Sequence, residues 1–408
     1  MERKIKIAII GGGISAIACA YKLAKANKNF DIHIYERDTQ LGGRLFIFFA
    51  GRVILESYSS TIWLMKELNL MSETEQLTPK DLGVLTPDGK AIAGGRDMQF
   101  YLAKEFLWRK RSLKLFLEMI KLIKYVQSLK FDFYNFESNI SPDIKKMSFS
   151  DFQAHYSKEI QQFILNPPQL LAPNSEDMSQ ISADRGIRML WSIYARKSLY
   201  YMNRAPQVYV DAFMKISLDL GITIHLNSKV EKVIKISDSE YQLNFSGGSR
   251  TDSADIAIST ASLPETQNII GKDFGIACSQ IRAILVKGKV RYPQYRMLLG
   301  THPETNISIM NIWGEYQVIC PIDHRLKPSK GSKIPDLYLN IDHLYEGGWE
   351  YIKDMWSTGM HLMLDQKMPE LEQDKNLYIC GDYHGFSGLE TAVISGIQVA
   401  DKIIDKYH

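Results

Sequence analysis

The residues most suited to chemistry are the glycines close to the N-terminus. Gly11, Gly13 and Ala16 form a Gly-x-Gly-x-x-Ala pattern that directly follows the apolar run from Lys4 to Ile10. In such a turn the first glycine permits a tight bend, the second lets the backbone approach a pyrophosphate, and the small third residue lets a helix pack closely on a strand. The pattern predicts a phosphate-binding turn.

The flanking residues predict the elements that such a turn needs. The run from Lys4 to Ile10 is apolar and β-branched, which is typical of a buried parallel strand. Residues 14–26 have the periodicity of a helix, and Asp31 to Tyr35 form a second short apolar run. The chain is therefore expected to open with a strand–turn–helix–strand unit.

Two kinds of protein group near this turn are expected to bind a dinucleotide. The first N–H groups of the helix, at Ile14, Ser15 and Ala16, are expected to face the phosphates, because a helix N-terminus carries unused N–H groups and positive dipole charge. Glu36 ends the second strand, where a carboxylate accepts hydrogen bonds from ribose hydroxyls and would repel the 2′-phosphate of NADP. The pattern predicts a bound dinucleotide.

The next residues resemble a known family. The stretch from Glu36 to Arg44 (Glu-Arg-Asp-Thr-Gln-Leu-Gly-Gly-Arg) looks like the Glu…Gly-Gly-Arg segment of the flavin amine oxidase superfamily. That superfamily includes monoamine and amino-acid oxidases, protoporphyrinogen oxidase and phytoene desaturases. The resemblance implies that the cofactor is FAD, that the backbone at Gly42 and Gly43 follows its diphosphate, and that Arg44 helps to neutralise it. On the same ground Arg37 is counted among the cofactor-binding residues.

Two stretches in the middle of the chain resemble the same superfamily. Lys229 to Val233 is similar to the family strand whose backbone clasps the adenine, which assigns that contact to Val230. Asp255 to Pro264 resembles the strand that then returns to the sheet. With the C-terminal motif, the resemblance covers roughly residues 1–60, 225–265 and 370–408.

The C-terminal stretch from Leu377 to Gly396 matches the last motif of the superfamily. The resemblance implies that Gly381 and Asp382 meet the ribityl or phosphate end of FAD. A helix is expected to start near Glu390, so that the N–H groups near Thr391 and Ala392 face the pyrimidine edge of the flavin. These three residues are therefore counted among the cofactor contacts.

The reacting residues are not identified by the sequence. Many amine oxidases keep a lysine near flavin N5, but the register places Ile284 at that position, with Lys287 close by. Trp356 is a further candidate for the flavin pocket, with the core as its alternative, and His384 is another, with a structural role as its alternative. The family's cysteine attachment motif is absent, so the FAD is expected to be non-covalent.

The length of 408 residues predicts two domains, since single cores tend to divide above about 300 residues. We expect an α/β fold: a Rossmann-like FAD-binding domain with a parallel sheet and a βαβ start, interleaved with a mixed α/β substrate domain. Further strands are predicted at 222–226, 230–236, 241–245, 255–259, 287–292, 337–341 and 377–380, and a last helix at 390–405. The FAD domain would comprise 1–75, 225–265 and 370–408, and the substrate domain 76–224 and 266–369.

Composition limits the partners and the metals. A net charge of +3 is not that of a dedicated nucleic-acid binder, and no apolar run is long enough to span a membrane. The four cysteines form no Cys-x-x-Cys pair, so neither a metal site nor a disulfide framework is expected, and the cytoplasm is the default location. Residues 101–130 hold eight Lys/Arg against two Asp/Glu, which suits either peripheral membrane contact or a solvated basic face.

The reaction follows from the resemblance, because flavins accept hydride. We expect an FAD-dependent oxidoreductase that removes a hydride from a C–N bond of an amine or amino acid. One alternative is a desaturase or dehydrogenase that oxidises a C–C bond in a lipophilic or macrocyclic substrate. Another is a flavoprotein that uses FAD structurally or without net redox turnover. The substrate, the electron acceptor and the oligomeric state stay open.

Overall fold

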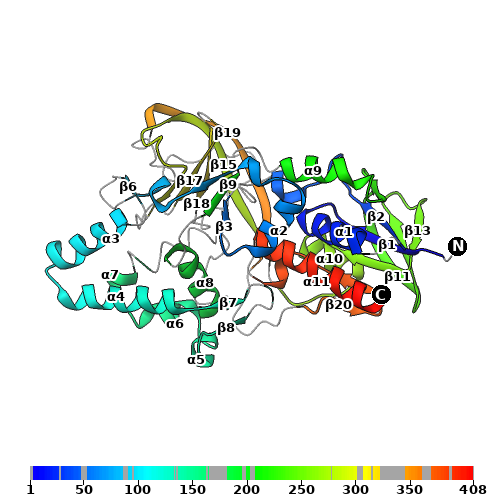
Figure 1. Ribbon diagram of the computed structural model, residues 1–408, viewed down its shortest axis with the longest axis horizontal. Coiled ribbons are helices and arrows are strands. Elements are labelled where there is room, and N and C mark those ends of the chain that lie inside the picture. Colours follow the sequence, from blue (N-terminus) through cyan, green and yellow to red (C-terminus); the bar gives the residue numbers. More distant parts are fainter. Residues whose placement is uncertain are drawn as a thin grey trace.

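Two lobes make up the computed structural model of the chain, with both termini in the same lobe (Figure 1). The structure describes residues 3–26, 29–46, 53–85, 91–93, 96–132, 134, 137–161, 164, 182–194, 199–202, 207–276, 278–300, 307–313, 316–321, 345–360, 369–385 and 388–407.

A parallel sheet forms the centre of the first lobe. Within the described residues it has six strands in the order β10-β2-β1-β14-β21-β20, all parallel except for the edge strand β20. The strands are β1 (Ile5–Ile10), β2 (Phe30–Tyr35), β10 (Ile222–His225), β14 (Ile256–Ser259), β20 (Glu372–Asp374) and β21 (Leu377–Ile379). Neighbouring strands therefore come from the beginning, the middle and the end of the sequence.

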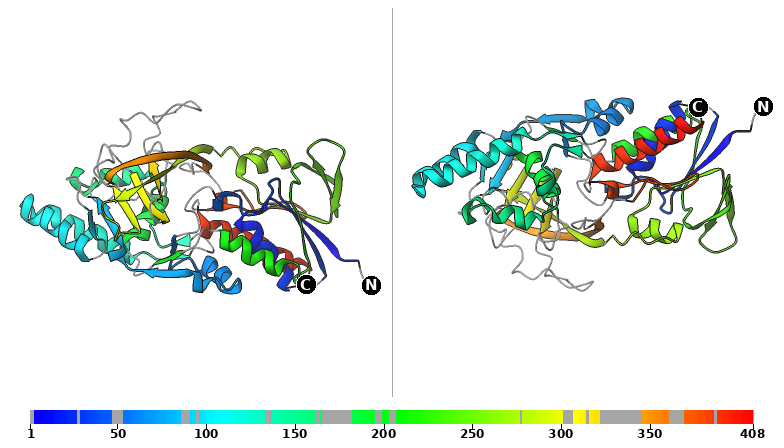
Figure 2. Two further views of the ribbon diagram at one scale, coloured as in Figure 1. Left: turned by 90° about the horizontal axis from the view of Figure 1, so that it is seen from above. Right: turned by 90° about the horizontal axis from the view of Figure 1, so that it is seen from below.

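The alternation of side chains along β1 shows why this sheet is covered on both faces. Ile7 and Ile9 point into a core built with the helices α1 (Ile14–Ala26), α9 (Gln207–Ser217) and α11 (Leu389–Tyr407). Ala8 and Ile10 point to the other face, where they pack against a β-meander and the helix α10 (Leu263–Ile270). The meander consists of β11 (Val230–Ser237), β12 (Glu240–Phe245) and β13 (Thr251–Ala254). Figure 2 shows these layers edge-on.

The second lobe combines a mixed sheet with a group of helices (Figure 1). Among the described residues, the sheet order is β19-β15-β18-β17-β16-β5-β6, antiparallel except for the pair β16 and β5. Its strands are β5 (Leu82–Leu85), β6 (Ala91–Ala93), β15 (Cys278–Val290), β16 (Met297–Gly300), β17 (Ile307–Trp313), β18 (Tyr316–Pro321) and β19 (Tyr345–Met360). The helical part has its own apolar core, which includes Leu102, Phe106, Met119 and Leu122.

The helices of this second part are short apart from α4. They are α3 (Arg96–Ala103), which continues into a π-helical turn η4 (Lys104–Arg109), then α4 (Leu113–Ser128), α5 (Pro142–Lys145), α6 (Phe149–Ala154), α7 (Lys158–Ile160) and α8 (Ala183–Tyr194). A two-stranded ribbon, β7 (Phe131–Asp132) and β8 (Glu137–Ser138), lies among them.

The remaining elements connect the lobes and pack mainly on the first one. A small sheet in the order β3-β9-β4 contributes Ile54 and Met202 to the core of the parallel sheet, and α2 contributes Leu64 and Met65. Their bounds are β3 (Val53–Leu55), β4 (Thr74–Leu77), β9 (Leu199–Met202) and α2 (Ser59–Glu67), with short helical turns at η1 (Gly43–Phe46), η2 (Met71–Glu73), η3 (Pro79–Asp81) and η9 (Asp382–His384).

Most predicted elements are confirmed, but the structure also has strands that were not predicted. The opening strand, helix and strand agree with β1, α1 and β2 within a residue, and the last helix agrees with α11. The strand predicted at 287–292 is part of the longer β15, whereas β4, β5, β6 and β9 lie in stretches for which no strand was predicted. The strand predicted at 337–341 lies outside the described residues.

Packing favours wider limits for the middle segment of the first domain than the predicted 225–265. Helix α9 buries Tyr209 and Phe213 in the same core as α1, and β10 is an edge strand of the parallel sheet. On the other side, Ile269 of α10 packs against the meander, and Ile276 packs against Ile379. The segment that belongs with the parallel sheet thus runs from about α9 to Ile276.

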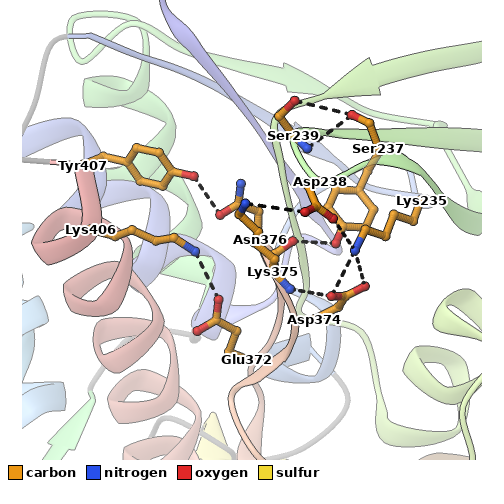
Figure 3. A network of polar contacts seen from close by, with 11 residues as sticks. Lys235, Ser237, Asp238, Ser239, Glu372, Asp374, Lys375, Asn376, Lys406 and Tyr407 are labelled. Carbon is orange, nitrogen blue, oxygen red and sulfur yellow. Dashed lines mark hydrogen bonds and ion pairs between the residues drawn. The ribbon is translucent and has the colours of Figure 1, made fainter.

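A polar network ties the meander and the last helix to the edge of the parallel sheet (Figure 3). The Lys235 ammonium lies 2.9 Å from Asp238 and 3.0 Å from Asp374, which links the first strand of the meander to β20. The Tyr407 hydroxyl donates to Asn376 Oδ1 over 2.7 Å. Since exposed ion pairs are each worth little, these contacts align the layers more than they stabilise them.

The close crossing of α1 and α11 depends on the absence of a side chain at Gly396. A Cβ added there would lie only 2.3 Å from the carbonyl oxygen of Ser15. Gly396→Val should therefore push the helices apart and lower the free energy of unfolding by about 2–3 kcal/mol, as overpacking does in other cores. Chemical denaturation measures this loss.

The exposed position Lys402 on the same helix supplies the matched control, since Lys402→Val introduces the same β-branched side chain without a clash. If both variants unfolded at the same denaturant concentration, the contact between the helices would not require glycine.

Candidate functional site

The turn between β1 and α1 has the geometry that its glycines predict. Gly11 has a φ of 101°, in the left-handed region, and a Cβ there would lie 2.8 Å from Thr260 Oγ1. The Thr260 hydroxyl donates to the carbonyl oxygen of Ile10 over 3.0 Å, which fixes the end of β14 against the turn. Gly11 is therefore required by the fold itself, through its backbone conformation and through its contact with Thr260.

Gly13 differs, because nothing in the protein requires a glycine there. Its φ lies outside the left-handed region, and a Cβ added to it would meet no atom within 4 Å. Gly13 is the N-cap of α1, a position where serine, threonine, aspartate or asparagine would fit and would also cap the helix, so the choice of glycine needs another reason. An external group that approaches the backbone closely supplies that reason, and a pyrophosphate fits it.

Glu36 is buried beside this turn and organises it. Its Oε2 accepts the N–H of Gly12 over 2.6 Å, and its Oε1 accepts the N–H of Asp38 over 2.9 Å, while the residue is 5 % exposed. A Cβ at Gly12 would collide with Glu36 and with Leu41, which explains the middle glycine. Each carboxylate oxygen can accept more than one hydrogen bond, so the predicted contact with a ribose stays a prediction.

The second pair of glycines lies directly beside the first turn. The N–H of Gly42 donates to the carbonyl oxygen of Gly12 over 2.8 Å, and a Cβ on Gly43 would lie 3.8 Å from the Cα of Gly13. Gly42 and Gly43 both have positive φ, 118° and 50°. The two glycine segments, distant from each other in the motif, thus form one continuous backbone surface next to the open space at Gly13.

Arg44 and Asp382 meet on the same side, although 338 residues separate them. The guanidinium of Arg44 makes two hydrogen bonds to the Asp382 carboxylate, of 2.8 and 2.5 Å. The Asp382 side chain is 8 % exposed and that of Arg44 is 36 % exposed. A charge-assisted pair with this geometry is strong. It joins the N-terminal and C-terminal motifs at the place where the resemblance puts the cofactor.

The loop that carries Asp382 is fixed from the last helix. The N–H of Gly381 donates to Ser395 Oγ over 2.9 Å, and a Cβ on Gly381 would collide with the Tyr383 ring. Both residues of the predicted Gly381-Asp382 pair therefore have backbone or side-chain contacts that set their position. Their contact with a cofactor stays a prediction.

Arg37 and Val230 lie at the edge of this region. The Arg37 guanidinium makes an ion pair with Glu265 at the start of α10, and its side chain is 49 % exposed. Val230 is buried against Tyr35 and Phe245 where the meander begins. The structure thus gives Arg37 a surface partner in the protein, and it places Val230 close to Tyr35 at the end of β2, one residue before Glu36.

The start of α11 corrects one predicted donor. The helix begins at Leu389, and the N–H of Ala392 donates to the carbonyl oxygen of Gly388 over 3.1 Å. That N–H closes the first helical turn, so its predicted contact with the flavin is wrong. The N–H groups that a helix cannot use internally precede Ala392 in the chain. The role predicted for Thr391 stays a prediction.

Glu390 has a structural role that the sequence did not show. Its carboxylate accepts the N–H groups of Ser60 and Thr61 over 2.9 and 2.8 Å and the Thr61 hydroxyl over 2.6 Å. These donors begin α2, whose N-cap residue Tyr58 offers no side-chain bond, so Glu390 caps a helix 330 residues away. Burial raises the pKa of Glu390, and the hydrogen bonds from Thr61 and Ser60 oppose that shift.

Three residues were candidates for the reacting site. His384 is buried beside Tyr383, and its Nε2 has no hydrogen-bond partner within the described part of the chain. The Lys287 ammonium lies 5.9 Å above the half-exposed Tyr316 ring, on the other face of β15 from the buried Ile284. Trp356 is on β19, but its side chain lies outside the described ones. None of the three gains a catalytic role from these contacts.

Arg185 was missed by the sequence reading. From helix α8 it donates to the carbonyl oxygen of Gly385 over 3.2 Å, so a cation of the helical part reaches the loop that follows Asp382. Burial lowers the pKa of the Arg185 guanidinium to about 9, and the neighbouring Asp184 acts in the opposite direction. No local motif marks this residue, because the contact depends on how the two lobes meet. Within the described residues, no group of three or more His, Cys, Asp or Glu side chains could hold a metal.

Comparisons with known proteins agree with this geometry. Residues 9–72 match the model of an NAD(P)-binding Rossmann-like domain. The structure resembles an oxidoreductase from Methanosarcina mazei at 14 % identity and a TM-score of 0.68, covering 97 % of this chain and 100 % of the other. It also resembles cyclohexylamine oxidase from Brevibacterium oxydans, at 15 % identity and a TM-score of 0.66, with 99 % of each chain covered.

A third similar structure is that of an isomerase. The fatty acid isomerase of P. acnes that produces CLA has 14 % identity to this chain and a TM-score of 0.66, covering 100 % of this chain and 99 % of the other. No curated protein sequence matches the chain. The Rossmann-like α/β fold predicted from the sequence is confirmed, and the chain shares its overall fold with an oxidoreductase, an amine oxidase and a fatty acid isomerase.

The open space at Gly13 gives the first test of the site. Gly13→Val should fold normally, because a Cβ at this position meets no protein atom within 4 Å, but its side chain should block a diphosphate. We expect about 100-fold weaker dinucleotide binding, equivalent to the loss of two charge-assisted hydrogen bonds to the phosphates. Cofactor released by acid from purified protein measures the effect, and unfolding of the apoprotein measures stability. Full cofactor content in the variant would rule out this cradle.

The burial of His384 predicts a sensitivity to acid. Burial lowers the pKa of His384 to about 4, whereas an unfolded histidine titrates near 6.5. The unfolded chain therefore binds more protons between these values, so stability is full above about pH 6.5 and falls as the pH approaches 4. The free energy of unfolding falls by about 3 kcal/mol over this pH range.

His384→Met should remove most of the pH dependence of the free energy of unfolding. Denaturant unfolding of the apoprotein across that pH range measures this change. His155→Gln, at an exposed position, is the control and should leave the pH dependence unchanged. The same pH dependence in His384→Met and in the native protein would show that His384 already takes up a proton in the folded state.

Proposed function

We propose that the chain is an FAD-dependent oxidoreductase. The observation that carries the proposal is the continuous backbone surface of the two glycine segments beside the open space at Gly13, which suits a dinucleotide diphosphate. FAD is favoured over NAD because the second glycine pair, Arg44 and Asp382 lie next to this surface, and all of them belong to motifs that resemble the flavin superfamily.

The residues would divide the work of binding between them. Glu36 would bind the ribose, and Thr391 would contact the flavin edge. The backbone from Gly11 to Gly13 and at Gly42 and Gly43 would bind the diphosphate. The FAD would be bound without a covalent bond. Bound FAD supplies a hydride acceptor. The protein then has to bind the substrate, orient a carbon–hydrogen bond towards it and exclude water, which requires no metal and no nucleophile.

The reaction we favour is removal of a hydride from a C–N bond of an amine or amino acid. The support is the fold shared with cyclohexylamine oxidase, together with the superfamily motifs. The substrate we propose is a small molecule. A cytoplasmic location fits the proposal, because Cys19 and Cys380 are buried and free.

A second reaction has a specific observation in its favour. The fold is shared to the same degree with a fatty acid isomerase, and no lysine stands at Ile284, the register position at which many amine oxidases keep one. Chemistry at a carbon–carbon bond of a lipophilic substrate, with or without net oxidation, is therefore the alternative.

Anaerobic titration of the holoprotein distinguishes these reactions. An amine or amino-acid substrate should abolish the absorbance of the oxidised flavin, and the rate should rise about tenfold per pH unit below the pKa of the substrate amine, because only the neutral amine reacts. A pH-independent loss of absorbance with an uncharged lipophilic compound would support C–C oxidation instead. Product formed from such a compound with the absorbance unchanged would indicate isomerisation without net redox turnover.

A further inference from the structure

The turn between α3 and α4 exposes large apolar side chains at one end of the molecule. Phe100 is 74 % exposed, Trp108 76 % and Leu113 63 %, and Leu107 and Leu117 are exposed to a smaller extent. Figures 1 and 2 both place this turn at the end of the second lobe that lies farthest from the N-terminus. We call residues 100–124 the tip.

The fold does not need these exposed residues, because the opposite side of the same elements is already buried. Leu102 and Phe106 on one arm, and Met119 and Leu122 on the other, form part of the apolar core of the helical region. The exposed side chains are thus additional to the apolar core that the described residues form. Isolated exposed apolar residues are ordinary, but a cluster of them marks an interaction surface.

The backbone of the tip is well defined by its own hydrogen bonds. The π-helical turn closes with the N–H of Lys110 on the carbonyl oxygen of Glu105, at 3.0 Å, and the N–H of Ser112 on that of Phe106, at 3.1 Å. The Ser112 hydroxyl then caps α4 by accepting the N–H of Leu115. Trp108 and Leu113 are therefore held on the outside by the same bonds that anchor Phe106 inside.

The tip is also strongly basic. Residues 100–124 contain seven Lys/Arg and two Asp/Glu, and both acids are engaged within the fold. Glu105 pairs with Arg109 over 3.2 Å, and Glu118 accepts the N–H of Ser157 over 2.7 Å. Five other cations of the tip are exposed and make no ion pair with a carboxylate of the described residues. They are Lys104, Arg111, Lys114, Lys121 and Lys124.

We propose that the tip binds the surface of an anionic lipid bilayer. Trp108 and the exposed leucines would enter the boundary between headgroups and acyl chains, where tryptophan is favoured, and the surrounding lysines and arginines would contact lipid phosphates. No helix within the described residues is long and apolar enough to cross a membrane. A nucleic acid would bind the cations of the tip but not its leucines. The combination of cations and exposed apolar side chains therefore favours a lipid surface.

Co-sedimentation with vesicles tests this without any substrate, so the outcome does not depend on the proposed reaction. The holoprotein should bind vesicles of phosphatidylcholine and phosphatidylglycerol in equimolar mixture, and should bind phosphatidylcholine vesicles at least about tenfold more weakly. The double variant Trp108→Glu, Leu113→Glu and the charge-reversal variant Lys114→Glu, Lys121→Glu should each lose about tenfold or more in binding.

Matched controls lie on the other lobe. Leu218→Glu changes another exposed leucine, on the chain after α9, and Lys402→Glu another exposed lysine, on α11, and both should bind like the native protein. Unfolding curves and cofactor content of all variants should match those of the native protein, since the tip is separate from the glycine segments. A blue shift of tryptophan fluorescence on adding anionic vesicles should be smaller in Trp108→Phe.

Three results would overturn the proposal. The first is no binding of anionic vesicles at low salt, and the second is equal binding by the tip variants and their controls. The third is binding of polyuridylate RNA as tight as that of anionic vesicles and equally weakened by the tip variants, which would assign the surface to nucleic acid.

Discussion

The contact on which the site depends is the hydrogen bond from the Gly12 N–H to the buried carboxylate of Glu36. A buried charge is tolerated only when hydrogen bonds replace its hydration, and Gly12 and Asp38 supply two of them. The bond closes the turn after β1 and fixes the end of β2 to it. The Gly12 carbonyl oxygen then accepts the N–H of Gly42, so the backbone of a single residue orders both glycine segments.

Two further contacts join the ends of the chain around this turn. Arg44 from the beginning pairs with Asp382, and Glu390 caps the helix that starts at Ser59 and Ser60. In each case a carboxylate of the C-terminal motif meets donors of the first 61 residues. Because removing one partner of a buried charge leaves the other uncompensated, the two motifs constrain each other strongly.

Sequence patterns predicted the elements around the glycine segments but not the contacts between distant elements. Alternating apolar residues with glycine punctuation are local signals, so β1, α1, β2 and α11 could be placed within a residue or two. The short strands β5, β6 and β9 carry no such signal, since their pairing with distant strands decides their structure. The capping role of Glu390 and the contact of Arg185 with Gly385 were invisible for the same reason. The donor assigned to Ala392 failed because the helix begins one residue earlier than expected.

The position of β1 in the middle of the parallel sheet has a consequence for how the protein is made. Its neighbour β14 lies some 250 residues downstream, and β14 in turn pairs with β21, close to the C-terminus. On the ribosome, the N-terminal strand and helix therefore emerge long before the strands and the helix that complete their core exist. Non-local pairing of this kind folds slowly and leaves apolar surface exposed meanwhile. The pair of Arg44 with Asp382 likewise forms only after the C-terminal residues have been made, so the glycine segments are completed at the end of synthesis.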